Sequence, residues 1–195
     1  MVEFNLPFAK AYLSKKDRYF ASDAIKNGWG KNSNKYINLF EKKFGEYVGS
    51  NYCISTSSCT GALHIALRAL DIKKDDEIIV PDLTWIATAS AVTYVNAKPI
   101  LAKVDQKTWC IDTNFIQKII TKKTKAIIAV HLYGNICNIN KLKQICKKNK
   151  LFLIEDSAES LGSELNKKKT GTFGDIGVFS FHGTKTFTTG EGGML

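Results

Sequence analysis

The chain has 195 residues, of which 44% are hydrophobic and 24% charged, and this composition is typical of one well-packed globular domain. No apolar run is long enough to span a bilayer and the N-terminus lacks the features of a signal peptide, so we expect a cytoplasmic protein with no membrane partner. The formal charge of +10 would suit a basic nucleic-acid-binding module, but the lysines are scattered and the only arginines are Arg18 and Arg68. We therefore expect no nucleic-acid partner and keep that module as an alternative.

Two amphipathic helices are predicted first, one from about residue 15 to 27 and one from about 34 to 48. Ser14 is a suitable N-cap for the first helix and Gly28 a suitable terminator. Strands and helices then alternate, with strands predicted at 52–55, 77–80, 98–104, 126–130, 151–154 and 176–181, and helices at 60–70, 85–94, 112–120 and 140–148.

Alternating strands and helices with short connections predict an α/β fold with a mostly parallel sheet. The strands AIIAV and LFLI lack polar alternation, which indicates that layers cover both of their faces. No linker or internal repeat interrupts the pattern, so we expect a single domain over residues 1–195.

The cysteines and histidines do not suggest a metal centre or a disulfide framework. The chain has five cysteines, an odd number, and none of them forms a CxxC pair. The three histidines lie far apart in the sequence. We expect reduced, mainly structural cysteines and no metal site.

Ligands of a parallel sheet bind beyond the carboxyl ends of its strands. Five polar segments follow predicted strands in this chain: STSSCTG, PDLTW, HLYG, EDSAES and HGTK. We expect these segments to meet at one cleft.

Three of the segments carry residues that would suit a phosphorylated aromatic ligand, although each has a plainer interpretation. The small-residue turn 57–61 at a helix N-terminus could bind a phosphate, or could simply cap the helix. Glu155 and Asp156 end an apolar strand, where a carboxylate could hold a protonated ring nitrogen or form a structural ion pair. Trp85 could stack on a planar ring or pack in the core.

The segment after the last predicted strand holds one lysine, Lys185, followed by a glycine-rich tail at 190–193. A lysine on a loop just past a buried strand is a candidate amine for a Schiff base with pyridoxal phosphate, and glycines would let the backbone approach a bound group. By itself, this stretch is better explained by a solvated lysine on a flexible turn, because lysine is abundant throughout the chain. Only the combination of this lysine with the other three signals favours a pyridoxal phosphate site.

The same segments resemble the DegT-type sugar-nucleotide aminotransferases, which are pyridoxal phosphate enzymes of fold type I. The resemblance covers essentially the whole chain and rests on SSCTGALHIAL, VPDLTWIATASAVTYVNAKPI, VHLYG, IEDSAESLGS and GTFGDIGVFSFHGTKTFTTGEGGM. The second and last of these segments are most similar to the perosamine synthases within the family. The resemblance implies the three-layer large domain of fold type I around a mostly parallel sheet.

The resemblance also implies roles for single residues. Lys185 would form the Schiff base and move a proton between cofactor and substrate, and Asp156 would hold the pyridinium nitrogen. Glu159 would lie beside the ring, and Trp85 would stack on its face.

The phosphate would be held by Ser180 and by the turn of Ser58, Cys59 and Thr60. Cys59 departs from the family, in which many members carry glycine at this position. Its Cβ and sulfur would crowd a phosphate, so Thr60 is the preferred ligand.

The implied reaction is transamination of a nucleotide-linked keto-sugar such as GDP-4-keto-6-deoxymannose, with glutamate as amino donor, in a homodimer. A related subgroup that dehydrates sugars carries histidine in place of the lysine, so Lys185 argues against dehydration. Family members are considerably longer than this chain. We therefore expect residues 1–195 to form a large domain truncated at its C-terminus, without the small C-terminal domain; an inactive fragment is an alternative.

Overall fold

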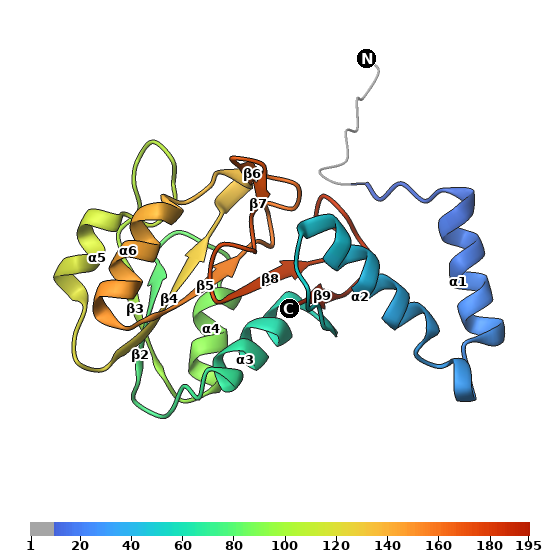
Figure 1. The fold of residues 1–195 in the computed structure, drawn as a ribbon, viewed down its shortest axis with the longest axis horizontal. Helices are drawn as coiled ribbons and strands as arrows, with labels where there is room; N and C mark the ends of the chain where they lie inside the picture. Colours follow the sequence, from blue (N-terminus) through green and yellow to red (C-terminus); the bar gives the residue numbers. More distant parts are fainter. Residues whose placement is uncertain (1–9) are drawn as a thin grey trace, which may run out of the picture.

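A computed structural model describes residues 10–195 as an α/β body with a helical extension at its N-terminal side (Figure 1). The helices are α1 (Lys15–Asn27), α2 (Lys35–Val48), α3 (Cys59–Ala69), α4 (Ala87–Tyr94), α5 (Thr113–Ile119) and α6 (Ile139–Asn149), with short 3-10 turns at Gly30–Asn32 and Leu132–Gly134. The strands are β1 (Ser55–Thr56), β2 (Glu77–Pro81), β3 (Lys98–Ala102), β4 (Thr124–Val130), β5 (Phe152–Asp156), β6 (Glu164–Leu165), β7 (Lys168–Lys169), β8 (Ile176–Ser180) and β9 (Gly193–Met194). Among the described residues, no helix has the length and apolar character needed to cross a membrane.

Seven strands form one sheet in the order β1-β9-β8-β5-β4-β2-β3. The four pairings from β8 to β3 are parallel, whereas β9 pairs antiparallel with both β1 and β8. The predicted α/β fold with a mostly parallel sheet is confirmed. Its parallel strands place their carboxyl ends at one edge.

Helices cover both faces of the sheet, which explains the continuously apolar strands. Successive side chains of a strand point to opposite faces. In β2, Ile78 and Val80 pack in the core beneath α3 and α4, whereas Ile79 packs in the second core beneath α5 and α6. The layers α3–α4, sheet and α5–α6 are visible in Figure 1.

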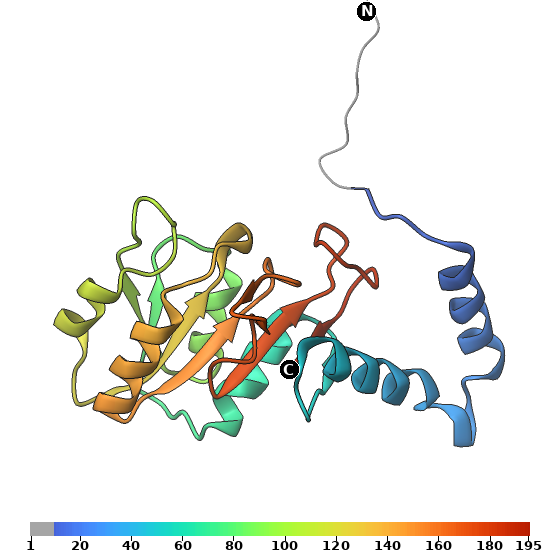
Figure 2. The same cartoon turned by 45° about the horizontal axis from the view of Figure 1, so that its top comes forward.

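Helix α1 stands away from the sheet, as Figure 2 shows, and none of its residues is buried. Its start is nevertheless well defined, because Ser14 and Asp17 form a reciprocal capping box. The N–H of Gly28 bonds to the carbonyl of Ala24 at the other end. The predicted bounds of this helix are therefore confirmed.

Several predicted bounds are wrong, and the strand expected at 98–104, for example, ends at Ala102. The strand expected at 52–55 is reduced to β1, and Tyr52 and Ile54 before it are mostly exposed. Helix α4 begins at Ala87, two residues after Trp85. The strand predicted at 151–154 runs on to Asp156, so both carboxylates belong to β5 itself.

Strands β6, β7 and β9 were not expected at all. Each has only two residues, which is too short to show an alternating pattern in the sequence. Their pairing partners define them: β6 pairs with β7, and β9 lies between β1 and β8.

Candidate active site

Four of the five polar segments, STSSCTG, PDLTW, EDSAES and HGTK, meet at a cavity of about 390 Å³ at the carboxyl edge of the sheet. Its lining includes every residue that the sequence proposed for a cofactor site: Ser58, Cys59, Thr60, Trp85, Asp156, Glu159, Ser180 and Lys185. They come from α3, from the segment before α4, and from the ends of β5 and β8 with the loops that follow. The expectation of a common cleft is therefore confirmed for these four segments, whereas no residue of HLYG lines the cavity.

The alternation of β5 separates the roles of its two carboxylates. Leu153 packs in the core on the α5–α6 side, and Ile154 packs in the core on the α3–α4 side. Glu155 therefore points to the first side and Asp156 to the second, beside α3 and α4. Only Asp156 lines the cavity.

Asp156 is almost fully buried, and both of its carboxyl oxygens have donors. The Thr88 hydroxyl donates to Oδ2 over 2.9 Å, and the backbone N–H of Ala158 donates to Oδ1 over 3.2 Å. Burial raises the pKa of Asp156 above its ordinary value, while these donors and the positive charge of Lys185 act in the opposite direction. The carboxyl group is thus held in one orientation at the wall of the cavity.

Glu155 is a buried carboxylate that holds the backbone of the segment 171–174 by hydrogen bonds. It accepts backbone N–H bonds from Gly171, Phe173 and Gly174 and contacts Nε2 of the buried His131 at 2.9 Å. Nδ1 of His131 accepts the N–H of Cys137, so a neutral ring with its proton on Nε2 satisfies both contacts. Glu155 therefore has a structural role, but the expected ion pair is a hydrogen bond from a neutral histidine, and the ligand-facing interpretation fits Asp156.

Lys185 is not a freely solvated charge. Its ammonium lies 3.2 Å from Oε1 of Glu159, and both side chains are mostly shielded from solvent. The second Glu159 oxygen accepts the backbone N–H of Tyr133 over 3.0 Å. Tyr133 has a φ of 52°, a left-handed conformation that a bulky residue rarely adopts. A positioned amine with an adjacent carboxylate is an arrangement suited to nucleophilic or proton-transfer chemistry.

The N-terminus of α3, which also lines the cavity, has the features of an anion site. Ser58 caps the helix by accepting the N–H of Gly61 over 3.1 Å, while the first N–H groups of a helix have no intrahelical acceptor. The helix dipole adds partial positive charge at this end. The Thr60 and Ser180 residues line the same cavity, so hydroxyl donors accompany these backbone groups.

The thiol of Cys59 contacts the carboxyl group of Asp156, with Sγ 4.0 Å from Oδ1. Burial and the neighbouring carboxylate raise the pKa of this thiol well above its ordinary value, and Lys185 opposes them. The group is therefore a neutral thiol, and its sulfur contacts the Asp156 carboxylate, which lies next to the turn.

Gly193 accounts for part of the glycine-rich tail. A Cβ at this position would lie 2.5 Å from the carbonyl carbon of Ser58 and 2.6 Å from the nitrogen of Cys59. Strand β9 can pass the start of α3 only because this residue has no side chain. The close approach at Gly193 is thus to the chain's own backbone, whereas the sequence had suggested an approach to a ligand.

Trp85 lies with 74% of its surface exposed and lines the cavity, so the alternative of a core tryptophan is wrong. Two further residues of the site, Thr88 and Tyr133, were missed. Thr88 is a hydroxyl residue within an apolar helical segment, and this signal could have identified it. Tyr133 contributes only its backbone, for which the sequence gives no signal.

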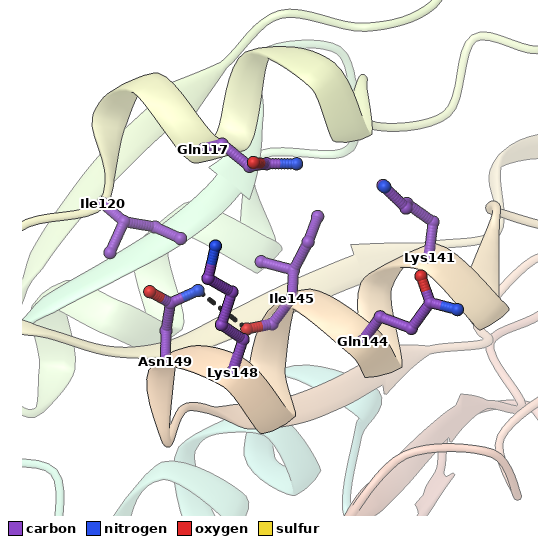
Figure 3. Close-up of a pocket in the computed structure, with 7 residues that line it drawn as sticks. All are labelled: Gln117, Ile120, Lys141, Gln144, Ile145, Lys148 and Asn149. Atoms are coloured by element: carbon purple, nitrogen blue, oxygen red, sulfur yellow. Dashed lines mark hydrogen bonds between the residues drawn. The ribbon is translucent and has the colours of Figure 1, made fainter.

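A second depression, of about 350 Å³, lies between α5 and α6 (Figure 3). Long polar side chains such as Lys141 and Gln144 line it, with Ile120 and Ile145. None of the residues proposed for the cofactor contributes to it. The residues that the sequence proposed for a cofactor lie in the cavity at the strand ends.

Comparison with known proteins identifies relatives over nearly the whole chain. The profile of the DegT/DnrJ/EryC1/StrS aminotransferase family matches residues 12–195. GDP-perosamine synthase of Escherichia coli O157:H7 is 44% identical over 190 residues, which are 97% of this chain and 52% of that protein. The synthase of Vibrio cholerae is 40% identical over the same shares. The chain spans about half the length of these curated relatives.

Solved structures agree with these sequence matches. An aminotransferase from Psychrobacter cryohalolentis superposes with a TM-score of 0.91 and 34% identity, covering 97% of this chain and 48% of that one. An E. coli GDP-4-keto-6-deoxy-D-mannose-3-dehydratase, solved with bound hydrated pyridoxal phosphate, superposes with a TM-score of 0.89 and 30% identity over 97% and 50% of the two chains.

Proposed function

The chain belongs to the DegT/DnrJ/EryC1/StrS aminotransferase family, and from this premise we propose that it forms the cofactor-binding part of a pyridoxal-phosphate-dependent sugar aminotransferase. One observation carries the proposal. Lys185, paired with Glu159, and Asp156, buried and oriented, line the same cavity together with the N-terminus of α3. The cavity therefore combines an amine, a carboxylate and a site suited to an anion.

The residues of the cavity fit pyridoxal phosphate in their chemistry. The start of α3, with Thr60 and Ser180, offers N–H and hydroxyl donors to a phosphate group. Asp156 offers a buried anion to a protonated ring nitrogen, and the exposed Trp85 offers a flat face to the ring. Pyridoxal phosphate, when bound, supplies an aldehyde that bonds to amines and a ring that accepts electrons.

The chain's own residues would then divide the work. Asp156 keeps the ring nitrogen protonated, because a buried carboxylate stabilises an adjacent positive charge. Lys185 provides the amine that bonds the cofactor and, once free, carries the proton at its Nζ atom. Glu159 holds Lys185 in place, since its carboxylate contacts the ammonium at 3.2 Å. The turn Ser58–Thr60 anchors the phosphate end.

The substrate we propose is a nucleotide-linked keto-sugar, such as GDP-4-keto-6-deoxymannose, with glutamate as amino donor and a homodimer as the working assembly. The similarity to GDP-perosamine synthases over 97% of the chain supports this substrate class. A lysine at position 185, where the dehydrating subgroup has histidine, supports amination over dehydration.

The proposal is tested by cofactor loading of the protein and its Lys185→Ala variant. Wild-type protein mixed with pyridoxal phosphate should show the absorbance of lysine-bound cofactor, and borohydride reduction should place the label on the peptide that contains Lys185. The variant should lose both signals, whereas a Lys150→Ala control at an exposed helix end should keep them. Labelling of another lysine, or an unchanged band in the Lys185→Ala variant, would contradict the assignment.

Transfer of the amino group is tested separately. The keto-sugar nucleotide is incubated with glutamate and the loaded protein, and the amino-sugar product is measured. Loading at Lys185 without product from any nucleotide-linked keto-sugar would leave the cofactor site standing and refute the substrate class.

A further inference from the structure

Thr88 is a buried threonine whose hydroxyl forms a hydrogen bond with Asp156. It lies in the first turn of α4 with 1% of its surface exposed, and its hydroxyl is 2.9 Å from Oδ2 of Asp156, a residue 68 positions away in the sequence. The Thr84 hydroxyl lies 3.2 Å from that of Thr88. Thr84, Thr88 and Asp156 therefore form a short chain of polar contacts that ends at the cavity.

The direction of these hydrogen bonds follows from the inventory of donors. An ionised carboxylate only accepts hydrogen bonds, so Thr88 must donate its single hydroxyl proton to Asp156. The Thr88 oxygen can then only accept, so Thr84 donates to it. Because the N–H of Ala158 donates to Oδ1, both oxygens of the carboxylate are fixed and the plane of the group is set.

Several neighbouring groups determine whether the Asp156 carboxyl is ionised or neutral. Burial favours its neutral form. Lys185, from the loop after β8, favours the anion, as do the donors Thr88 and Ala158. His131, after β4, is neutral and its Nε2 contacts Glu155, so it adds no charge here. Cys59, from α3, contacts Oδ1 as a neutral thiol. Among the donors, Thr88 makes the shortest contact to the side chain and is the one whose hydroxyl can be removed without altering the backbone.

We propose that Thr88 is a positioning residue that keeps Asp156 ionised and aimed at the ring nitrogen of the cofactor. The proposal rests on the function proposed above, because it assigns Asp156 to that nitrogen. Packing does not require the hydroxyl: Ala91 and Val92 of the same helix lie in the apolar core, and valine has nearly the shape of threonine. The polar atom at this position is therefore present for its bond to Asp156.

The test compares Thr88→Val, which removes the donor, with Thr88→Ser, which keeps it. A hydrogen bond to a charged group contributes about 1.5–3 kcal/mol, so Thr88→Val should bind pyridoxal phosphate about 10- to 140-fold more weakly. Cofactor labelled with ¹⁵N at the ring should show a protonated nitrogen in wild type and in Thr88→Ser, and a largely unprotonated nitrogen in Thr88→Val. Thr124→Val, a buried hydroxyl in β4 away from the cavity, is the matched control and should leave the nitrogen signal unchanged.

A second readout does not need the cofactor. In cofactor-free protein carrying ¹³C-labelled aspartate, Asp156 should titrate at a higher pH in Thr88→Val than in wild type. A carboxyl titration that is the same in both proteins would overturn the proposal, and so would a Thr88→Ser variant that behaves like Thr88→Val. Failure of wild-type protein to take up pyridoxal phosphate would instead refute the proposed function, and the aspartate titration would still decide whether Thr88 keeps Asp156 ionised.

Discussion

Replacing Glu155 by glutamine should destabilise the fold strongly, although the two side chains have nearly the same shape. The carboxylate is fully buried and receives four contacts: from Nε2 of His131 at 2.9 Å and from the N–H groups of Gly171 at 3.0 Å, Phe173 at 2.5 Å and Gly174 at 2.6 Å. All four partners present hydrogens to it, since the neutral ring carries its proton on Nε2.

A glutamine has one accepting oxygen and one donating amide group. Its oxygen can take the N–H groups of Phe173 and Gly174, which share Oε1 in the native structure. Its amide group would then face the N–H of Gly171 and the ring N–H of His131. Neither of these two donors would have an acceptor. Each buried donor without an acceptor costs about 1–3 kcal/mol. With two such donors, we expect the free energy of unfolding to fall by about 2–6 kcal/mol.

Urea unfolding measures this loss as a lower transition midpoint with an unchanged slope. The control is Glu164→Gln, because Glu164 has half of its side chain exposed and pairs with Lys169 at the surface. Glu164→Gln should lower the free energy of unfolding by less than about 0.5 kcal/mol. A loss below about 1 kcal/mol for Glu155→Gln would show that the four contacts do not hold the segment at 171–174 as described.

The same group predicts an acid limit. Burial raises the pKa of Glu155, but the hydrogen bond from His131 and the N–H groups of Gly174 and Gly171 outweigh it, so the pKa lies below its ordinary value of 4.5. A carboxylate with a lowered folded-state pKa stabilises the fold above the unfolded-state value, and this contribution is lost as the pH falls through the folded-state value. The stability difference between wild type and Glu155→Gln should therefore be full above pH 4.5 and shrink below it.

Two further changes test how the site and the extension are built. Gly193→Ala would place a Cβ 2.5 Å from the backbone of Ser58, so thermal unfolding should show a loss of about 1–3 kcal/mol; Gly183→Ala, whose nearest atom is at 3.8 Å, should cost under about 1 kcal/mol, and equal losses would contradict the close approach. Ser14→Ala removes the N-cap of α1 and should speed amide exchange in that helix about fivefold. The midpoint of global unfolding should stay constant, because no residue of α1 is buried, and a shifted midpoint would show that α1 belongs to the folded core.

The sequence by itself determined the class of fold and the location of the site. Alternating strands and helices specified an α/β sheet, and the carboxyl ends of parallel strands necessarily share one edge. The segments carrying Ser58, Trp85, Asp156 and Lys185 therefore had to meet, and they do. The bounds of the longer helices followed from periodicity and caps, as Ser14 shows for α1.

Only the tertiary structure decided what each side chain does there. The alternation along β5 requires Glu155 and Asp156 to point to opposite faces, but the packing of α3 and α4 determines which face holds the cavity. The bond from Thr88 to Asp156 joins residues 68 positions apart, and no local pattern encodes such a contact. Lys185 was a plausible amine in the sequence, and its contact with Glu159 shows that the fold also positions it. Periodicity and turn chemistry act over a few residues, whereas these contacts arise only when separate layers pack together.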